Sequence, residues 1–433
     1  MNKINIGKEM YRWAEDLFPI TRSITGAGVR ETLGYIKKLI PDLEIHSVPS
    51  GTTAFDWTVP NEWNIREAYI ADESGRKLVD FKNHNLHVMG YSVPVDRWLD
   101  RDELDKHLYS KPEQPDAIPY RTSYYKKRWG FCLSHNQRTL LGPGKYRVVI
   151  DSDLKPGVLN YGELILPGES DEEVLLSTYI CHPSLANNEL SGPVVTTALV
   201  QWLQGLNERR YTYRVVFVPE TIGSIVYLSK HAEWMKKKVK AGFVVTCAGD
   251  DRAYSFVPSR CGGTLADRIA GHVLNYEVDD YIKYSFLDRG SDERQYCSPL
   301  IDLPVVSIMR SKYSAYPEYH TSLDDLSLIS PTGLAGSYNV LCACLSALEM
   351  NYTYRVTIPC EPQLGKRGLY PSTRKVVRGH VEKVMMNFLA YADGTRDLLG
   401  IADEIGVSIQ ECAAIAIQME AHDLVERLEN RDC

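Results

Sequence analysis

Short apolar runs alternate with helical stretches from about residue 157 to residue 350, and this alternation constrains the fold more than any other feature. Several runs have the length and composition of buried strands: LNYGELILPG, EVLLSTYI, YRVVFVPE, AGFVVTCAG and LPVVSIM. Apolar residues at helical spacing separate several of them, as in VVTTALVQWLQGL and IVYLSKHAEWMKKKVK. Strands that alternate with helices predict an α/β domain with a largely parallel, buried sheet.

The rest of the chain differs in texture. The first segment reads as two helices broken at FPITRSITGAG. Residues 53–155 are rich in Trp, Tyr, Pro and short alternating runs, which predicts an inserted, mostly β domain. We therefore assign the α/β core to residues 1–52 and 156–362. Residues 368–433 read as short helices with Gly406 at a turn and an end strand, which predicts a winged helix-turn-helix domain.

Composition excludes several classes of protein. The net charge is −7 at pH 7, which argues against a general polyanion binder. No run approaches the roughly 18 apolar residues of a membrane helix, and the first residues lack the apolar region of a signal peptide. The 10 cysteines are scattered, without metal-finger spacing. We expect a cytoplasmic protein with no membrane partner.

Four polar segments lie next to the predicted strands, where sites form in α/β sheets. They are CHPSLANNELSG, PETIGS, GSDERQYCSP and EYHTSLDDL. His and carboxylate side chains are zinc ligands, and a nearby carboxylate can take a proton from an attacking water. The candidates are His182, Glu189, Glu220, Asp292, Glu293 and His320.

The order of these segments resembles the zinc-dependent aminopeptidases of the di-zinc exopeptidase superfamily, which also includes single-zinc glutaminyl cyclases. In that pattern a His follows a strand, as His182 does, and Asp-Asn-x-Ser-Gly comes next, here NELSG from Asn188. Glu-Glu-x-Gly corresponds to ETIG from Glu220, Ser-Asp to Ser291 and Asp292, and the late His-Thr to His320 and Thr321. The whole chain looks like a bacterial group of aminopeptidase-like proteins. That resemblance implies a three-layer α/β/α core, an inserted β domain and a C-terminal winged helix.

The same resemblance assigns roles to residues of this chain. It implies that Glu220 is the general base and that His182 and His320 are metal ligands. Asn188 holds the position of the bridging aspartate, Thr221 replaces the second Glu, and Cys247 replaces a later aspartate, unless a slip brings Asp250 or Asp251 there. With these carboxylates lost we expect one zinc ion rather than two, with Glu189 or Asn188 completing its ligands.

Asp292, Glu293 and Arg294 form a charged run that we expect at the mouth of the site. A carboxylate there would bind a free amino terminus, and Arg294 would bind a carboxylate. The predicted substrate is a short peptide or an amino-acid-like amide, and the inserted domain is expected to cover the cleft and limit access.

The predicted second helix of the winged helix, SIQECAAIAIQMEAHD, has no Lys or Arg to meet phosphates. We therefore expect it, or the inserted domain, to form a homo-oligomer contact rather than to bind nucleic acid. Two functions stay open. One is a metal-dependent hydrolase of peptide or related amide bonds, and the other is a non-catalytic, peptidase-like binding or regulatory protein whose winged helix contacts a protein or DNA.

Overall fold

The computed structural model describes residues 3–369 and 378–428. The chain forms two compact units. The first comprises Met1–Ala266 and Tyr281–Asn339, and the second comprises Asp267–Asp280 and Val340–Cys433. The ends of the predicted C-terminal domain at 370–377 and 429–433 lie outside the described residues.

An eight-stranded sheet forms the centre of the first unit, in the order β1-β10-β12-β11-β13-β16-β14-β15. The bounds are β1 (Glu44–Pro49), β10 (Val158–Leu166), β11 (Glu173–Tyr179), β12 (Thr212–Val218), β13 (Val239–Val244), β14 (Ser255–Val257), β15 (Ile282–Lys283) and β16 (Val305–Met309). Strand β11 pairs in parallel with β12 and β13, and β13 pairs in parallel with β16. Every residue of β11 is buried, which explains why its sequence is a continuous apolar run without alternation.

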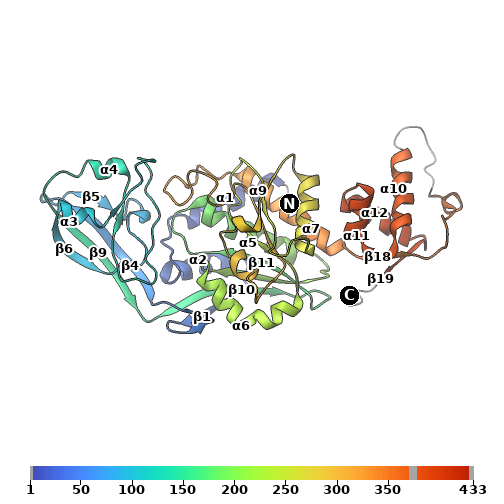
Figure 1. Cartoon of the computed structure of the whole chain (residues 1–433), viewed down its shortest axis with the longest axis horizontal. Coiled ribbons are helices and arrows are strands. Elements are labelled where there is room, and N and C mark those ends of the chain that lie inside the picture. Colours follow the sequence, from blue (N-terminus) through green and yellow to red (C-terminus); the bar gives the residue numbers. More distant parts are fainter. Residues whose placement is uncertain (1–2, 370–377, 429–433) are drawn as a thin grey trace. The chain divides into compact units, whose positions relative to one another are not determined.

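The connections out of β11 explain the layers. Helix α5 (Ser191–Gln204) leads from β11 to β12, and α6 (Ile222–Lys238) leads from β12 back past β11 to β13. Because the two connections run in opposite directions along the sheet, right-handed crossovers place their helices on opposite faces. Figure 1 shows this arrangement, with α1 (Lys3–Leu17) beside α5 and with α6 across the sheet. The predicted α/β/α core is confirmed.

The inserted region contains a four-stranded antiparallel sheet in the order β5-β4-β9-β6. Its strands are β4 (Glu62–Ala71), β5 (Lys77–Asp80), β6 (Val95–Asp100) and β9 (Lys145–Lys155). Buried and exposed residues alternate along much of β9, as expected for a sheet with one face towards a core. The mostly β character predicted for this region is confirmed, while its domain boundaries at 53 and 155 stay a prediction.

The second unit contains the winged helix. Its three-stranded sheet has the order β18-β17-β19, formed by β17 (Thr353–Val356), β18 (Asp393–Asp397) and β19 (Val425–Leu428). Its helices are α10 (Arg378–Tyr391), α11 (Leu398–Ile405) and α12 (Ile409–Glu420). Gly406 ends α11 with a φ of 72°, and the Ser408 hydroxyl accepts a hydrogen bond from Glu411 N to begin α12. The turn predicted at Gly406 is confirmed, because its left-handed conformation suits glycine.

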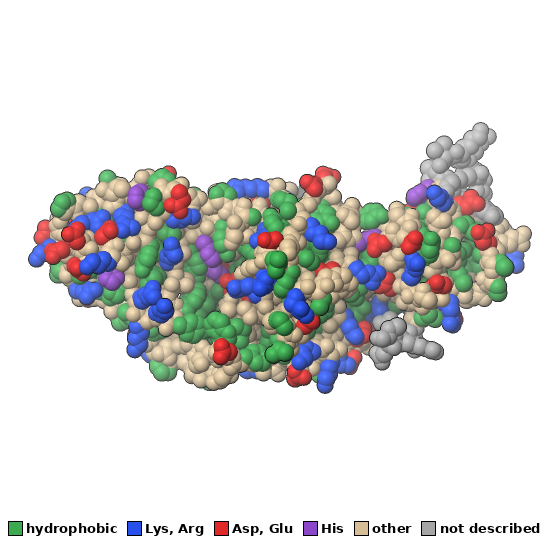
Figure 2. Space-filling view, in the orientation of Figure 1, with side chains coloured by type: hydrophobic (Ala, Val, Ile, Leu, Met, Phe, Trp, Pro, Cys, Tyr) green, Lys and Arg blue, Asp and Glu red, His purple; other side chains and the backbone are tan. Residues whose placement is uncertain are grey.

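The surface matches the mixed composition of the sequence. Figure 2 shows Lys and Arg side chains interspersed with Asp and Glu over the visible face of both units. Among the described residues, no helix combines the length and apolar composition that a membrane span requires. The preference of the winged helix for a protein contact over DNA stays a prediction.

Candidate functional site

The candidate site lies at the carboxyl end of β11. The connections through α5 and α6 run in opposite directions along the sheet at this point. In open α/β sheets this switch point is where ligands bind. The segment after β11 contains a π-helical turn at Ala186–Leu190, a rare geometry that often marks functional sites. Asn187, Asn188 and Glu189 are each no more than 1% exposed. Consecutive polar side chains this deeply buried need specific partners.

His182 lies between two carboxylates. Its Nδ1 is 2.8 Å from Oε2 of Glu189, and its Nε2 is 3.5 Å from Oε2 of Glu220. Burial and the nearby Arg22 cation together lower the pKa of His182 to about 3, so the imidazole is neutral near pH 7. When Nδ1–H donates to Glu189, Nε2 keeps a lone pair that faces Glu220.

Arg22 is a buried residue of this site that the sequence did not indicate. Its Nε donates to the carbonyl of His182 at 2.9 Å and lies 3.7 Å from Glu189 Oε1. The side chains of Arg22 and Glu189 are fully buried. Burial raises the pKa of Glu189, and the Arg22 cation opposes that rise. Glu189 therefore lies behind the imidazole ring, on the side away from Glu220.

His320 reaches the site from a loop that is distant in sequence and is hydrogen-bonded to the backbone of the inserted region. Its φ of 55° is left-handed, and its carbonyl accepts a hydrogen bond from Tyr120 N at 2.8 Å. Pro119 and Thr321 form an antiparallel bridge beside it. The imidazole stacks on Tyr319, with ring centroids 3.9 Å apart. These contacts aim the ring of His320 at His182, with centroids 5.4 Å apart.

Tyr120 forms an aromatic wall beside both histidines. Its ring centroid lies 5.0 Å from that of His182 and 5.1 Å from that of His320. Its hydroxyl pairs with that of Tyr124 at 2.9 Å. The run RTSYYKKRWGF beside it pointed to an aromatic module, but no sequence signal singled out Tyr120. The inserted region thus supplies a side chain that touches both predicted ligands.

Glu220 stands at the end of β12, on the open side of His182. Its side chain is 21% exposed, and its backbone N donates to Sγ of Cys181 at 3.2 Å. Desolvation and the nearby charge of Asp292 raise its pKa well above the usual range. A carboxyl with a raised pKa can exchange a proton near neutral pH, as a general base requires.

Asp292 and Glu293 are not at the mouth of the site, and this expectation was wrong. Both are fully buried, and backbone and hydroxyl donors satisfy one carboxylate oxygen of each. Asp292 Oδ1 accepts from Thr221 N at 2.7 Å and Ser224 Oγ at 2.8 Å, and burial raises the pKa of Asp292 to about 6. Glu293 Oε1 accepts from Gly290 N, Ser291 N and the Tyr313 hydroxyl.

Arg294 is the member of this run that stays partly exposed. It donates to Thr221 Oγ1 at 2.8 Å and to the carbonyl of Ser291 at 2.9 Å. Its guanidinium is therefore hydrogen-bonded to Thr221, the residue that replaces a carboxylate of the resembling family. The roles of Asp292, Glu293 and Arg294 in binding substrate stay predictions.

Asn188 and Cys247, which stand where the resembling family has carboxylates, are uncharged. Asn188 Nδ2 donates to the Tyr179 hydroxyl at 2.7 Å. Burial raises the pKa of the Cys247 thiol to about 12, so it stays protonated. Asp250 is occupied by Asn187 Nδ2 and by Ser311, and Asp251 accepts from Ser330. A register slip that brings Asp250 or Asp251 into the site is therefore not supported.

Several polar atoms around the site are buried and have no hydrogen-bond partner among the described residues. They include His320 Nε2, Asn188 Oδ1, Asp292 Oδ2 and Glu293 Oε2. Buried polar atoms are normally paired, so such a set suits a ligand or cation. Within the described part of the chain, Cys181, His182 and Glu189 form a cluster close enough to hold a metal ion. The donor set thus fits a metal in chemical type.

Comparison with known proteins identifies the family of the chain. The family described as "Domain of unknown function (DUF4910)" matches residues 11–351, and a winged helix-turn-helix family matches residues 352–427. A Clostridium acetobutylicum protein named "Putative polysaccharide biosynthesis protein with aminopeptidase-like domain" is 46% identical over 414 residues, which are 94% of this chain and 94% of that protein.

Solved structures give the same picture. The crystal structure of a "putative peptidase" from Clostridium acetobutylicum is 44% identical, covers 99% of this chain and 98% of that chain, and has a TM-score of 0.93. BSAP, a zinc aminopeptidase from Bacillus subtilis, has a TM-score of 0.58 at 10% identity and covers 79% of this chain and 95% of that chain. The latter likeness shows the shared fold.

Proposed function

The chain belongs to the DUF4910 family and has an aminopeptidase-like core, and we propose that it is a metal-dependent hydrolase of peptide or related amide bonds. The observation that carries this proposal is that two histidines from distant segments lie together and that a carboxylate lies beside one of them. The rings of His182 and His320 lie 5.4 Å apart, and Glu220 lies 3.5 Å from His182 Nε2.

One zinc ion would be held by Nε2 of His182 and Nε2 of His320, with the Asn188 amide oxygen as a further donor. The unpartnered Nε2 of His320 and Oδ1 of Asn188 support this set. When bound, zinc supplies Lewis acidity and lowers the pKa of a water molecule. Glu189 would then be a positioning residue for His182 and not a ligand.

The cluster of Cys181, His182 and Glu189 offers a different metal position, on the Nδ1 side of the ring. We favour the Nε2 side for three reasons. Nδ1 is already hydrogen-bonded to Glu189 at 2.8 Å. Burial raises the pKa of the Cys181 thiol, which disfavours a thiolate ligand. The Arg22 cation, 3.7 Å from Glu189, would repel a second cation there.

The residues of this chain divide the chemistry among themselves. Glu220 accepts a proton from the attacking water and returns it to the leaving amine, because its raised pKa lets it hold the proton between the two steps. Glu189 fixes the ring orientation and tautomer of His182. Tyr120 and Tyr319 surround the imidazoles and keep bulk water away from them.

A second function is favoured by the lost carboxylates. Asn188, Thr221 and Cys247 are neutral, and a protein that only binds an amino-acid-like ligand could keep the fold without the catalysis. Metal analysis of protein purified without chelator distinguishes the two. About one zinc ion per chain supports the hydrolase, whereas no zinc after zinc is added back supports the binding protein.

The test of the hydrolase is Glu220→Gln. The variant should retain its zinc and lose about 10²–10⁴-fold in rate, the usual contribution of a general base. Candidate substrates are aminoacyl amides, dipeptides and acetylated amino sugars, the last because the name of the Clostridium relative joins an aminopeptidase-like domain to polysaccharide biosynthesis. Glu318→Gln, near His320 but paired with Arg252, is the matched control and should keep its rate. A Glu220→Gln variant as fast as this control would refute the assignment.

A further inference from the structure

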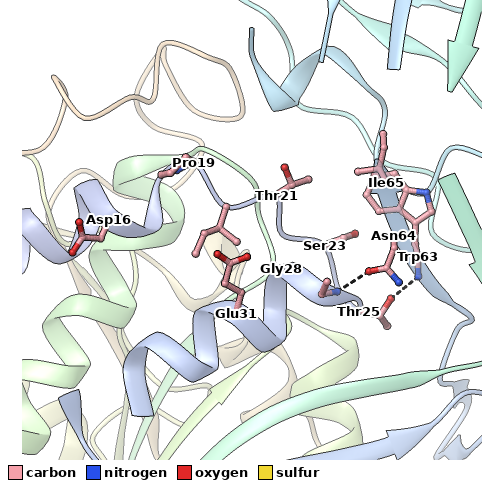
Figure 3. Close-up of a pocket in the computed structure, with 12 residues that line it drawn as sticks. Asp16, Pro19, Thr21, Ser23, Thr25, Gly28, Glu31, Trp63, Asn64 and Ile65 are labelled. Carbon is pink, nitrogen blue, oxygen red and sulfur yellow. Dashed lines mark hydrogen bonds between the residues drawn. The ribbon is translucent and has the colours of Figure 1, made fainter. Parts of the chain in front are cut away.

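A pocket lies apart from the two histidines, along the segment that joins α1 to α2 (Ala27–Leu39). We call residues 18–26 the connector and the cavity beside it the connector pocket. Its volume is about 370 Å³, which is in the range of small-molecule sites. Figure 3 shows it between the connector, the two helices and the start of β4.

The connector is held in one conformation by its contacts with β4. Gly26 has a φ of 101°, and a Cβ there would lie 2.2 Å from the carbonyl oxygen of Trp63. A Cβ on Gly28 would lie 2.0 Å from the carbonyl oxygen of Thr21. Trp63 N donates to Thr25 Oγ1, and Ala27 N donates to Asn64 Oδ1 (Figure 3). The pocket is thus bounded by fixed backbone, as preformed ligand sites usually are.

The lining of the pocket indicates the chemistry of its ligand. The hydroxyls of Thr21 and Ser23 have no hydrogen-bond partner among the described residues, and Ser23 is only 5% exposed. Asp16 and Glu31 add carboxylates, while none of the described lining residues is Lys or Arg. Such a lining suits hydroxyl and ammonium groups and disfavours an anion. Ile65 and its apolar neighbours can contact the C–H faces of a ring.

The connector also leads to the histidines. Arg22, in its middle, donates to the carbonyl of His182 at 2.9 Å and to that of Leu17 at 2.7 Å. A narrower cavity shares Thr21 and Ser23 with the connector pocket and is also lined by Tyr120. A ligand in the connector pocket would therefore lie against the segment that is bonded to His182.

We propose that the connector pocket binds a neutral or amino-bearing sugar unit through the hydroxyls of Thr21 and Ser23 and the carboxylate of Glu31. The proposal goes beyond the proposed hydrolysis and does not depend on it, because binding needs no turnover. Glucosamine and N-acetylglucosamine are the probes, and glucuronic acid is the anionic counterpart of the same size.

Saturation-transfer NMR and calorimetry on the full chain test the proposal. Both amino sugars should bind, and glucuronic acid should bind more weakly because Asp16 and Glu31 repel it. Thr21→Val and Ser23→Ala should each weaken binding about fivefold, the effect of one lost hydrogen bond. Glu31→Gln should weaken glucosamine more than N-acetylglucosamine, because only the former carries an ammonium group. Glucosamine has no amide bond to be hydrolysed, so its binding to Glu220→Gln should match its binding to the unmodified chain, and this keeps the test separate from that of the hydrolase.

Thr58→Val, on the exposed strand β3 (Trp57–Thr58), is the matched control and should bind like the unmodified chain. If Ser23→Ala does not fold, Thr21→Val and Glu31→Gln decide the outcome. The proposal is overturned if neither amino sugar binds, if glucuronic acid binds best, or if Thr21→Val and Ser23→Ala bind as tightly as Thr58→Val.

Discussion

The two sides of the candidate site are both largely buried but differ in electrostatic character. The histidine side consists of Arg22, His182, Glu189, Glu220 and His320. It holds charged groups, and the Nε2 atom of His320 is buried without a partner among the described residues. The neutral side consists of Tyr179, Thr246, Cys247 and the amide nitrogen of Asn188, and hydrogen bonds among these uncharged groups fill it.

The difference shows how many cations the site can take. A pair of divalent cations must be balanced by several nearby carboxylates, because unbalanced charge is costly in a buried site. On the neutral side, Tyr179 donates to the carbonyl of Asn188 at 2.7 Å. At the position of another lost carboxylate, Thr221 Oγ1 accepts from the Arg294 cation. Those bonds occupy the positions of the lost ligands without restoring charge. The comparison therefore favours a single metal ion on the histidine side.

Removal of either histidine should have the largest effect. His182→Ala and His320→Ala each delete one of the two proposed nitrogen ligands. Zinc content should therefore fall from about one ion per chain to less than about one tenth, because a metal site that loses a direct ligand binds its ion much more weakly. Zinc is measured by mass spectrometry on the folded fraction. His87→Ala is the matched control, because His87 is equally buried but bonds only to the carbonyl of Cys132. Zinc retained in both site variants would remove the distinction between the two sides.

Loss of the hydrogen bond between Glu189 and His182 Nδ1 should have a smaller effect on zinc binding than loss of a histidine. Glu189→Gln keeps the size of the side chain but removes the carboxyl group that bonds to His182 Nδ1 and lies beside Arg22, so zinc affinity or rate should fall about 10–100-fold. A competition assay with a zinc chelator measures the affinity. If Glu189 were itself a ligand, the loss of zinc would equal that in His182→Ala, and the site would lie on the Nδ1 side.

Parts of this site followed from the sequence, because they depend on local pattern. His182 directly follows a run that is apolar enough to be a fully buried strand, and such strands lie at the centre of parallel sheets where sites form. Glu220 follows the next strand in the same way. The strand pattern alone therefore predicts that both residues lie at the same edge of the sheet. The 3.5 Å distance between His182 Nε2 and Glu220 Oε2 agrees with this.

Other parts depend on tertiary contacts that no local pattern carries. The orientation of Glu189 follows from the π-helical turn, which places its carboxylate at Nδ1 of His182. Tyr120 reaches the histidines because the backbone of the inserted region bridges the loop around Thr321. The burial of Asp292 depends on the N–H of Thr221 and the hydroxyl of Ser224, so a charged run that normally indicates a solvated loop was misleading.

The pH dependence of stability in metal-free protein should separate the two sides. Burial lowers the pKa of His182 and of His320 to about 3, so below pH 6.5 the unfolded chain binds protons that the folded chain does not. Each histidine should therefore contribute a fall of about 2 kcal/mol in the free energy of unfolding between pH 7 and pH 5, while the raised pKa values of Glu189 and Glu220 act in the opposite direction. His320→Gln should remove its share of this fall, as measured by urea unfolding at both pH values. A fall of the same size in His320→Gln would contradict the prediction.

The smallest effect is expected on the neutral side. Cys247→Ser replaces a buried thiol, whose pKa is raised to about 12, with a hydroxyl that is also uncharged. Neither group supplies an anionic ligand, so zinc content and the change in stability between pH 7 and 5 should be unaltered. The substitution should cost about 1 kcal/mol, the effect of placing a hydroxyl where the sulfur accepts only long bonds from Thr246 and Asn188. Zinc content and urea unfolding measure both quantities. If zinc content falls as far as in His320→Ala, Cys247 is a thiolate ligand, and the metal is shared between the two sides.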